Sequence, residues 1–116
     1  IAREHSIAVS VETTDWIEIV RLYSALEAIA PGPVVILNRA IAVSMADGPA
    51  AALILVDELA ATGALRGSPM IPSVRGELLA RLGRSWEAVE QFETAAALTT
   101  AARQRDVLLA KAAAAR

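Results

Sequence analysis

The stretch that decides the fold is Leu82–Ala95, which reads LGRSWEAVEQFETA. Gly83 stands where a helix is expected to end, because helices often terminate at a residue in the left-handed conformation that glycine adopts without a steric cost. Ser85 is a good N-cap for a second helix, since its hydroxyl oxygen can accept a hydrogen bond from a free backbone N–H. The stretch therefore predicts two helices joined by a tight turn.

Small and large side chains share one face of the second helix. Ala88, Phe92 and Ala95 recur at helical spacing. The two alanines let a neighbouring helix approach closely, and the phenylalanine ring fills the space between turns. This pattern is typical of helix-turn-helix repeats of the tetratricopeptide (TPR) kind, and it predicts a surface for binding rather than a reaction centre.

An earlier part of the chain looks like a weaker copy of the same repeat. Placing Ala52 on Ala88 gives a spacing of 36 residues, close to the roughly 34 residues of a TPR. The other aligned pairs are Ala40 with Gly76, Val43 with Leu79, Val56 with Phe92, and Leu59 with Ala95. Because two repeats alone would leave both ends of the stack exposed, we expect a capping helix on either side.

Apolar periodicity and the positions of glycine and proline predict an all-α fold of about seven antiparallel helices and no strand. We expect breaks at Glu12–Asp15, where Asp15 and Glu18 have the spacing of a capping box, at Pro31–Pro33 and at Asp47–Pro49. The expected helices are 1–11, 16–29, 33–46, 49–62, a helix from near Pro69 and Pro72 to Leu82, 85–98, and a last helix capped by Thr99 and Thr100 that ends at 112–115.

Two of these helices carry informative apolar patterns. In 16–29 an apolar stripe is expected to face the core, and its members are Trp16, Ile19, Val20, Tyr23, Leu26 and Ile29. In 33–46 the run Val34–Leu37 favours a strand locally, but the length of the segment and its helical neighbours favour a helix. Because this helix has almost no polar face, we expect it to be central.

Composition excludes several classes of protein. The 116 residues are enough for one domain, expected here to be a single TPR-like helical domain over residues 1–116, and the formal charge of −2 provides no basic stripe that could neutralise phosphates. The chain contains no cysteine, which excludes disulfides and thiolate metal sites and fits a reducing cytoplasm. No apolar run is long enough to cross a bilayer, so we expect no membrane association.

The sequence starts at Ile1 inside an expected helix, which indicates a fragment of a longer protein.

Several motifs occur in an order that resembles one protein family. They are Thr14-Asp15-Trp16, Leu22-Tyr23, Pro33-Val34-Val35, Leu37–Val43 (LNRAIAV), Gly48-Pro49 and Glu77–Arg84 (ELLARLGR). Together they resemble the C-terminal extension of those bacterial extracytoplasmic-function (ECF) sigma factors that carry a TPR-like domain after their promoter-recognition regions. The resemblance covers nearly the whole chain, and the Leu-Asn-Arg-Ala block is its most specific element. The chain departs from the family pattern at Ala64–Pro72.

The resemblance implies an interaction and regulatory domain that supports or tunes transcription initiation. Its expected partners are the sigma-factor core regions, within the same chain, and RNA polymerase, with DNA contacted only through sigma regions that this chain lacks. A homodimer is a further candidate assembly, because the apolar content is high. The alternative is a stand-alone TPR-like adaptor that binds a peptide of a partner unrelated to transcription.

Asn38 and Arg39 form a polar pair in the otherwise apolar helix 33–46. A buried arginine needs a partner, for which Asp15, Asp57 and Glu77 are the candidates, and Asn38 could satisfy backbone groups at a neighbouring helix end. We expect this pair to be a structural clamp, since most buried polar groups serve the fold.

Arg81, Arg84 and Trp86 lie close together around one turn and form a candidate partner-contact patch. Tryptophan and arginine are the residues that most often anchor protein interfaces. Trp86 is off the Ala88 stripe and is expected to be partly exposed, whereas Trp16 and Tyr23 lie on the inward stripe and are expected to pack in the core.

No catalytic, metal-binding or cofactor-binding site is predicted. Glu87, Glu90 and Glu93 are spaced three apart, but helical di-metal sites need a Glu-x-x-His partner, and the only histidine is His5. A solvated acidic face is the better interpretation. No nucleophile elbow, phosphate-binding loop or dinucleotide fingerprint is present, so we expect no enzymatic activity.

Overall fold

The structure, a computed structural model, describes residues 2–29 and 32–116, with side chains described from Asp15 to Ile29 and from Gly32 to Arg116. Within these ranges the chain forms helices and turns and no strand, which confirms the predicted all-α class. The helices are α1 (Ala2–Ile29), α2 (Pro33–Asp47), α3 (Pro49–Ala61), α4 (Met70–Arg81), α5 (Ser85–Leu98) and α6 (Ala102–Ala115).

The described part of the chain thus holds six helices rather than about seven, because the expected break at Glu12–Asp15 is wrong. These four residues continue α1 as a single helix of 28 residues. Asp15 and Thr14 are good residues for a helix start, but they are also tolerated inside a helix at a cost of a few tenths of a kcal/mol each, about 0.7 at most. A segment without glycine or proline contains nothing that forces a helix to stop.

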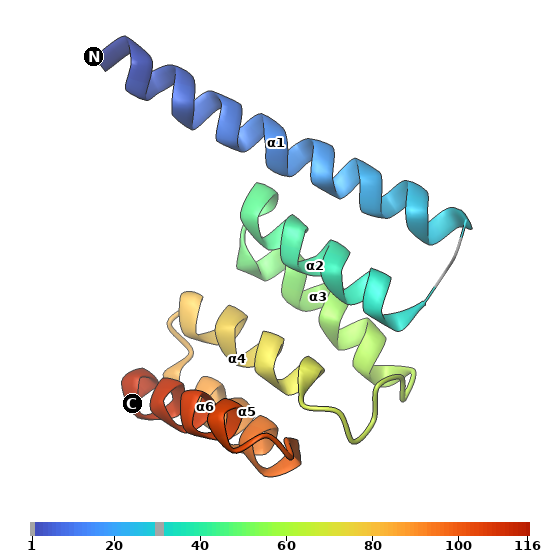
Figure 1. Cartoon of the computed structure of the whole chain (residues 1–116), viewed down its shortest axis with the longest axis vertical. Coiled ribbons are helices and arrows are strands. Elements are labelled where there is room, and N and C mark those ends of the chain that lie inside the picture. The colour runs from blue at the N-terminus through green and yellow to red at the C-terminus, as the bar shows by residue number, and fades with distance from the viewer. Residues whose placement is uncertain (1, 30–31) are drawn as a thin grey trace.

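The helices stack in the order of the chain. Each one packs against the next, from α1 on α2 through to α5 on α6, and α2 also touches α4. Figure 1 shows α1 lying across one end of the molecule, the α2–α3 pair beneath it, and α4 with α5 and α6 at the other end. α2 lies between α1 and α3, so its prediction as a central helix is confirmed.

The turn after α4 has the predicted form. Gly83 adopts a φ of +76°, the N–H of Arg84 donates to the carbonyl oxygen of Leu79 (2.9 Å), and the N–H of Gly83 donates to that of Ala80 (3.1 Å). This is a Schellman motif, in which glycine provides the left-handed residue that closes the helix. The next helix begins at Ser85 itself with Arg84 in the N-cap position, so the predicted capping role of Ser85 is wrong.

The start of α6 also differs from the prediction. Ala101 is its N-cap residue and makes no side-chain cap. The hydroxyl of Thr99 instead accepts a hydrogen bond from the N–H of Ala101 (3.3 Å), so this threonine holds the turn from one residue further back. Thr99 is 5% exposed, so this residue of the turn between α5 and α6 is packed in the interior.

Most of the positions that align in the two expected repeats are buried in both helical pairs, and the exception is Val43, which is half-buried. Ala52 and Ala88 are both 0% exposed, and Val56 and Phe92 are 0% and 2% exposed. α2 with α3 and α4 with α5 are therefore packed by the same arrangement of small and large side chains. The pattern of the sequence predicted this core correctly.

A close contact in the core joins Gly76 of α4 to Phe92 of α5. A Cβ atom placed on Gly76 would lie 2.7 Å from two ring carbons of Phe92, a distance that real Cβ atoms do not reach. The ring thus lies directly on the backbone of α4. Because the interior is packed as densely as an organic crystal, it has no space into which the ring could retreat.

The predicted inward stripe of α1 is only partly correct. Trp16, Val20 and Tyr23 are half-buried against the rest of the molecule, whereas Leu26 and Ile29 are exposed, the latter to 82%. Among the described residues α2 is the main neighbour of α1, and one neighbouring helix covers only one side of a wide apolar stripe.

We predict that Gly76→Ala destabilises the protein by about 1 to 3 kcal/mol, the usual cost of overpacking a core. Helix propensity alone would favour alanine over glycine by about 1 kcal/mol, so the sign of the effect separates the two causes. Chemical denaturation measures it. Ala80→Gly, at an exposed position of the same helix, is the matched control for propensity, and a Gly76→Ala variant more stable than the wild type would contradict the close contact.

Candidate interaction surfaces

Arg39 links α2 to α1. Its Nη1 lies 3.0 Å from Oε2 of Glu27, and both side chains are about one quarter exposed, at 25% and 26%. The sequence-based choice of Asp15, Asp57 or Glu77 as its partner is therefore wrong. The spacing along the chain could not reveal Glu27, because that pairing depends on the angle at which α1 crosses α2.

The rest of the predicted clamp is less complete. Nε of Arg39 is buried and has no hydrogen-bond acceptor among the described residues. Asn38 is half-buried, and its side chain makes no hydrogen bond to a described helix end. The ion pair with Glu27 is thus the contact on which a clamp role depends.

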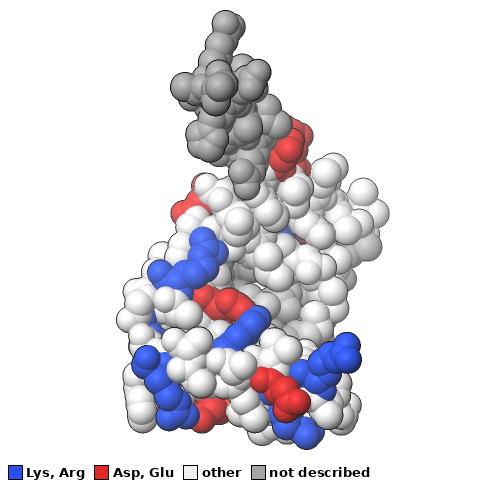
Figure 2. All heavy atoms as spheres, turned by 60° about the vertical axis from the view of Figure 1, so that its left-hand side comes forward, with Lys and Arg blue, Asp and Glu red and all other residues white. Residues whose placement is uncertain are grey.

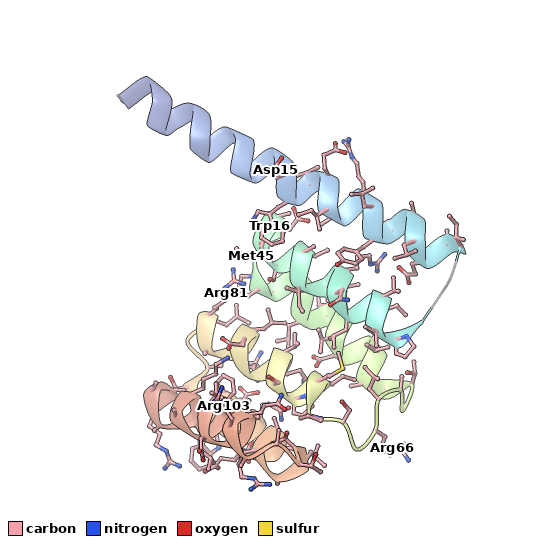
Figure 3. The ribbon with its side chains drawn as sticks, in the orientation of Figure 1. Asp15, Trp16, Met45, Arg66, Arg81 and Arg103 are labelled. Atoms are coloured by element: carbon pink, nitrogen blue, oxygen red, sulfur yellow. The ribbon has the colours of Figure 1, made fainter. Side chains whose placement is uncertain are left out.

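Arg81 connects the last turn of α4 to the end of α2. Its Nη2 donates a hydrogen bond to the carbonyl oxygen of Ser44 (3.1 Å). A carbonyl in the last turn of a helix has no intrahelical partner, and a cation there is favourable for the helix dipole. Arg81 also borders a largely apolar hollow of about 240 Å³ between these helices, next to Ile41 and Met45. Figure 3 shows Arg81 beside the end of α2 that carries Met45.

Arg84 is engaged with a neighbour in sequence. Its Nε and Nη2 donate to Oε1 and Oε2 of Glu87 at 2.8 and 2.5 Å, a bidentate pair between two exposed side chains. The hydrogen bond to Arg84 lowers the pKa of Glu87, and the same bond raises the pKa of Arg84. The pair fixes the turn in front of α5 and leaves few donors of Arg84 free.

Trp86 is the most exposed member of the predicted patch, with 77% of its surface accessible. It borders a second apolar hollow, of about 240 Å³, together with Ser85, Val89 and Arg116. Arg81 does not line this hollow, so the two residues belong to different surface features. Of the three residues of the predicted patch, Trp86 is available as an aromatic anchor, whereas Arg81 and Arg84 already bind other groups of the same chain.

The acidic residues of α5 are paired with cations in two cases. Glu87 pairs with Arg84, and Glu93 lies 3.0 Å from Nη2 of Arg116. No group of three or more potential metal ligands is found in the described part of the chain, and the side chain of His5 lies outside it. Figure 2 shows basic and acidic side chains interspersed on the lower part of one face, a distribution that provides no continuous basic stripe there.

None of the described helices combines the length and the hydropathy needed to cross a membrane. α1 would be long enough, with 28 residues, but it carries charged side chains such as Glu18 and Arg21 in the half whose side chains are described.

A hollow at the connection between α3 and α4 corresponds to no motif in the sequence. Arg66 and Arg75 line it, and Arg75 also contacts Asp57 of α3 and Gln91 of α5. Asp57 and Gln91 lie 18 and 16 positions from Arg75 and match no motif with it, so only the folded chain brings these residues together.

We predict a measurable coupling between Arg39 and Glu27. A double-mutant cycle with Arg39→Ala and Glu27→Ala should give about 0.5 to 1 kcal/mol, because partial burial reduces screening by water. Urea denaturation of the four proteins gives the value. The exposed pair of Arg21 and Glu18 (2.8 Å) is the matched control, and an equal coupling energy in both cycles would show that Arg39 contributes no more than a surface ion pair.

We also predict that Glu87 titrates below an ordinary glutamate. Because its pKa is lowered in the folded state, the stabilisation by this pair is present above the ordinary pKa of a glutamate and is lost as the pH falls through the pKa of the folded state. NMR of the side-chain carboxyl carbon follows this titration. Arg84→Gln should return the pKa of Glu87 to the ordinary range, and a pKa of Glu87 that this variant leaves unchanged would contradict the role of the hydrogen bond.

Comparison with known proteins identifies one relative without a described function. The chain is 49% identical over 100 residues to an uncharacterized protein of Rhizobium meliloti (strain 1021). The match covers 86% of this chain and 23% of that protein, so the chain spans about a quarter of its relative's length. No protein-family model matches the sequence, and no solved structure is significantly similar to it.

Proposed function

We propose that this chain is a non-catalytic, TPR-like interaction domain that acts as the C-terminal extension of an ECF sigma factor. In this role it supports or tunes transcription initiation in the bacterial cytoplasm by packing against the sigma core regions of its own polypeptide or against RNA polymerase. The observation that carries the proposal is the ordered series of family-like motifs, centred on the Leu-Asn-Arg-Ala block at 37–40.

The position of this block in the fold supports the proposal. The block lies on α2, between α1 and α3, where Leu37 is 1% and Ala40 is 0% exposed. Arg39 of the same block forms the ion pair to α1. The residues that most resemble the sigma-factor extension are thus those that join α1 to the stack of helical pairs. A family with this architecture would need these residues to hold α1 in place.

The length of the relative also supports a role within a larger protein. The matched segment is 23% of the Rhizobium meliloti protein, so a segment of this kind is one part of a longer chain there. A domain of a longer protein can act on its neighbours at high effective concentration, without a high intrinsic affinity.

The exposed surface is suited to contacts with protein. Trp86 and Ile29 are both more than three-quarters exposed, and large exposed apolar groups are typical of surfaces that a partner covers. The described charges are mixed in sign, which favours protein over nucleic acid as the direct partner of this domain.

The proposal predicts a sigma factor in the reading frame that encodes this chain. Upstream of Ile1 the frame should encode a polymerase-binding helical region followed by a helix-turn-helix. The complete protein should bind core RNA polymerase and direct transcription from its own promoter, and deletion of residues 33–116 should reduce or abolish promoter-dependent transcription. A frame that encodes no such regions would contradict the sigma assignment and favour the stand-alone adaptor.

We predict that Trp86→Ala in the complete protein leaves folding intact and weakens function. An exposed side chain contributes within about 0.5 kcal/mol to stability, whereas an aromatic interface anchor contributes about 2 kcal/mol or more to binding. Thermal unfolding and run-off transcription measure the two effects. Ile54→Ala, at a 61% exposed position of α3, is the control, and equal transcription by both variants would exclude Trp86 as the anchor.

A further inference from the structure

A hollow of about 300 Å³ lies where the α3–α4 connection passes the C-terminal half of α5. It has no role in the proposed contacts of Trp86 or Arg81. Its floor is apolar and comes from three helices, with Ala60 from α3, Ile71 and Pro72 from α4, and Leu98 from α5. The connecting residues 63–68 form its wall.

Arg75 brings a guanidinium group to this hollow. Its Nη1 donates a hydrogen bond to Oε1 of Gln91 (3.2 Å), and its Nε lies 2.9 Å from Oδ1 of Asp57. The carboxylate oxygen is not aligned with the Nε–H bond, so this buried donor has no hydrogen-bond acceptor among the described residues. Nη2 makes no hydrogen bond to a described residue either. The position of the group is therefore fixed, and Nη2 is the nitrogen that has neither a hydrogen-bond nor an ion-pair partner among the described residues.

Arg66 provides a second guanidinium at the edge of the same hollow. It forms no ion pair with a described residue, and Figure 3 shows it on the connection between α3 and α4. Its Nη2 would lie 3.1 Å from a Cβ atom on Gly63, so the guanidinium occupies the space that a side chain there would take. The turn around Arg66 is closed by a hydrogen bond from the N–H of Ser68 to the carbonyl oxygen of Leu65 (3.0 Å), which holds its backbone beside the hollow.

The lining residues contain two cations and no acidic side chain. Asp57 lies outside the lining and balances the charge of Arg75, so the hollow keeps one net positive charge. A guanidinium binds a carboxylate in bidentate geometry, and the apolar floor favours a ligand with a short hydrocarbon body. Both features select an anion with a single charge and an aliphatic chain.

We propose that this hollow binds a small aliphatic monocarboxylate, with the carboxylate between Arg66 and Arg75 and the hydrocarbon chain over Ile71, Pro72 and Leu98. The site joins the α3–α4 connection to α5, so its occupation would tie the two helical pairs together. The inference depends only on the geometry of these residues and stands whether or not the chain belongs to a sigma factor.

The test is a titration of the ¹⁵N-labelled chain with hexanoate, followed by NMR. We expect shifts of the Arg75 Nε–H resonance and of the backbone amides of residues 63–68 and 94–98. Hexanol, which has the same chain length and no charge, should bind at least about tenfold more weakly, the factor expected for the loss of a charge-assisted hydrogen bond. Acetate, which has the charge and almost no hydrocarbon, should also bind more weakly.

Variants separate the roles of the two arginines. Arg66→Gln should weaken hexanoate binding about tenfold without a change in the thermal midpoint, because this side chain has no structural ion pair in the described molecule. Arg75→Gln should weaken it further, but this variant also loses the contacts to Asp57 and Gln91. Arg103→Gln, at an exposed position of α6 that does not line the hollow, is the matched control and should bind as the wild type does.

Three results would contradict a carboxylate site in this hollow. Equal affinity for hexanol and hexanoate would show an apolar hollow without selection for the anion. Shifts on hexanoate addition that persist in Arg66→Gln, or that lie outside residues 60–75 and 91–98, would place the binding elsewhere. No shift at millimolar hexanoate would mean that the hollow binds no such ligand. Each of these results would overturn the assignment.

Discussion

The architecture depends on the contact between the ring of Phe92 and the bare backbone of α4 at Gly76. This contact sets the distance between α4 and α5, and α5 in turn supports α6. Dense packing transmits the constraint, because a helix that is displaced by one side chain must lose contacts on its other face. In the α2–α3 pair the aligned residues are Ala40 and Val56, and both are fully buried.

α2 has a second function in the fold, since it joins the long helix α1 to the stacked pairs. Its apolar residues pack on α3, and Arg39 reaches Glu27 on the other side. A partly buried ion pair contributes little net free energy but disfavours other registers, because any shift of α1 would leave a charge without its partner. The residues that most resemble the sigma-factor family therefore specify the position of α1 on the stack. A fixed position of α1 supports the proposal that the chain serves as a docking domain.

The surface combines features of different chemistry that lie on different elements. Trp86 provides an exposed aromatic group at the start of α5, whereas Arg66 and Arg75 provide unused donors beside an apolar hollow at the α3–α4 connection. The first is suited to a protein partner and the second to a small anion. In a stack of helices that contact mainly their neighbours, occupation of one junction can alter the stability of the elements on both sides of it. The hollow is therefore well placed to influence the stack without touching the aromatic surface.

The sequence by itself determined the helical class, the glycine turn at Gly83 and the buried positions of both repeats, because spacing and residue size act locally along one helix. It failed at Glu12–Asp15, where good capping residues do not end a helix, and at Ile29, whose exposure depends on how many helices cover α1. Only the tertiary structure decided that Arg39 pairs with Glu27 and that Arg75 meets Asp57 and Gln91. Such pairings are set by crossing angles and helix separations, which arise from the packing of whole faces and leave no periodic signal in the order of residues.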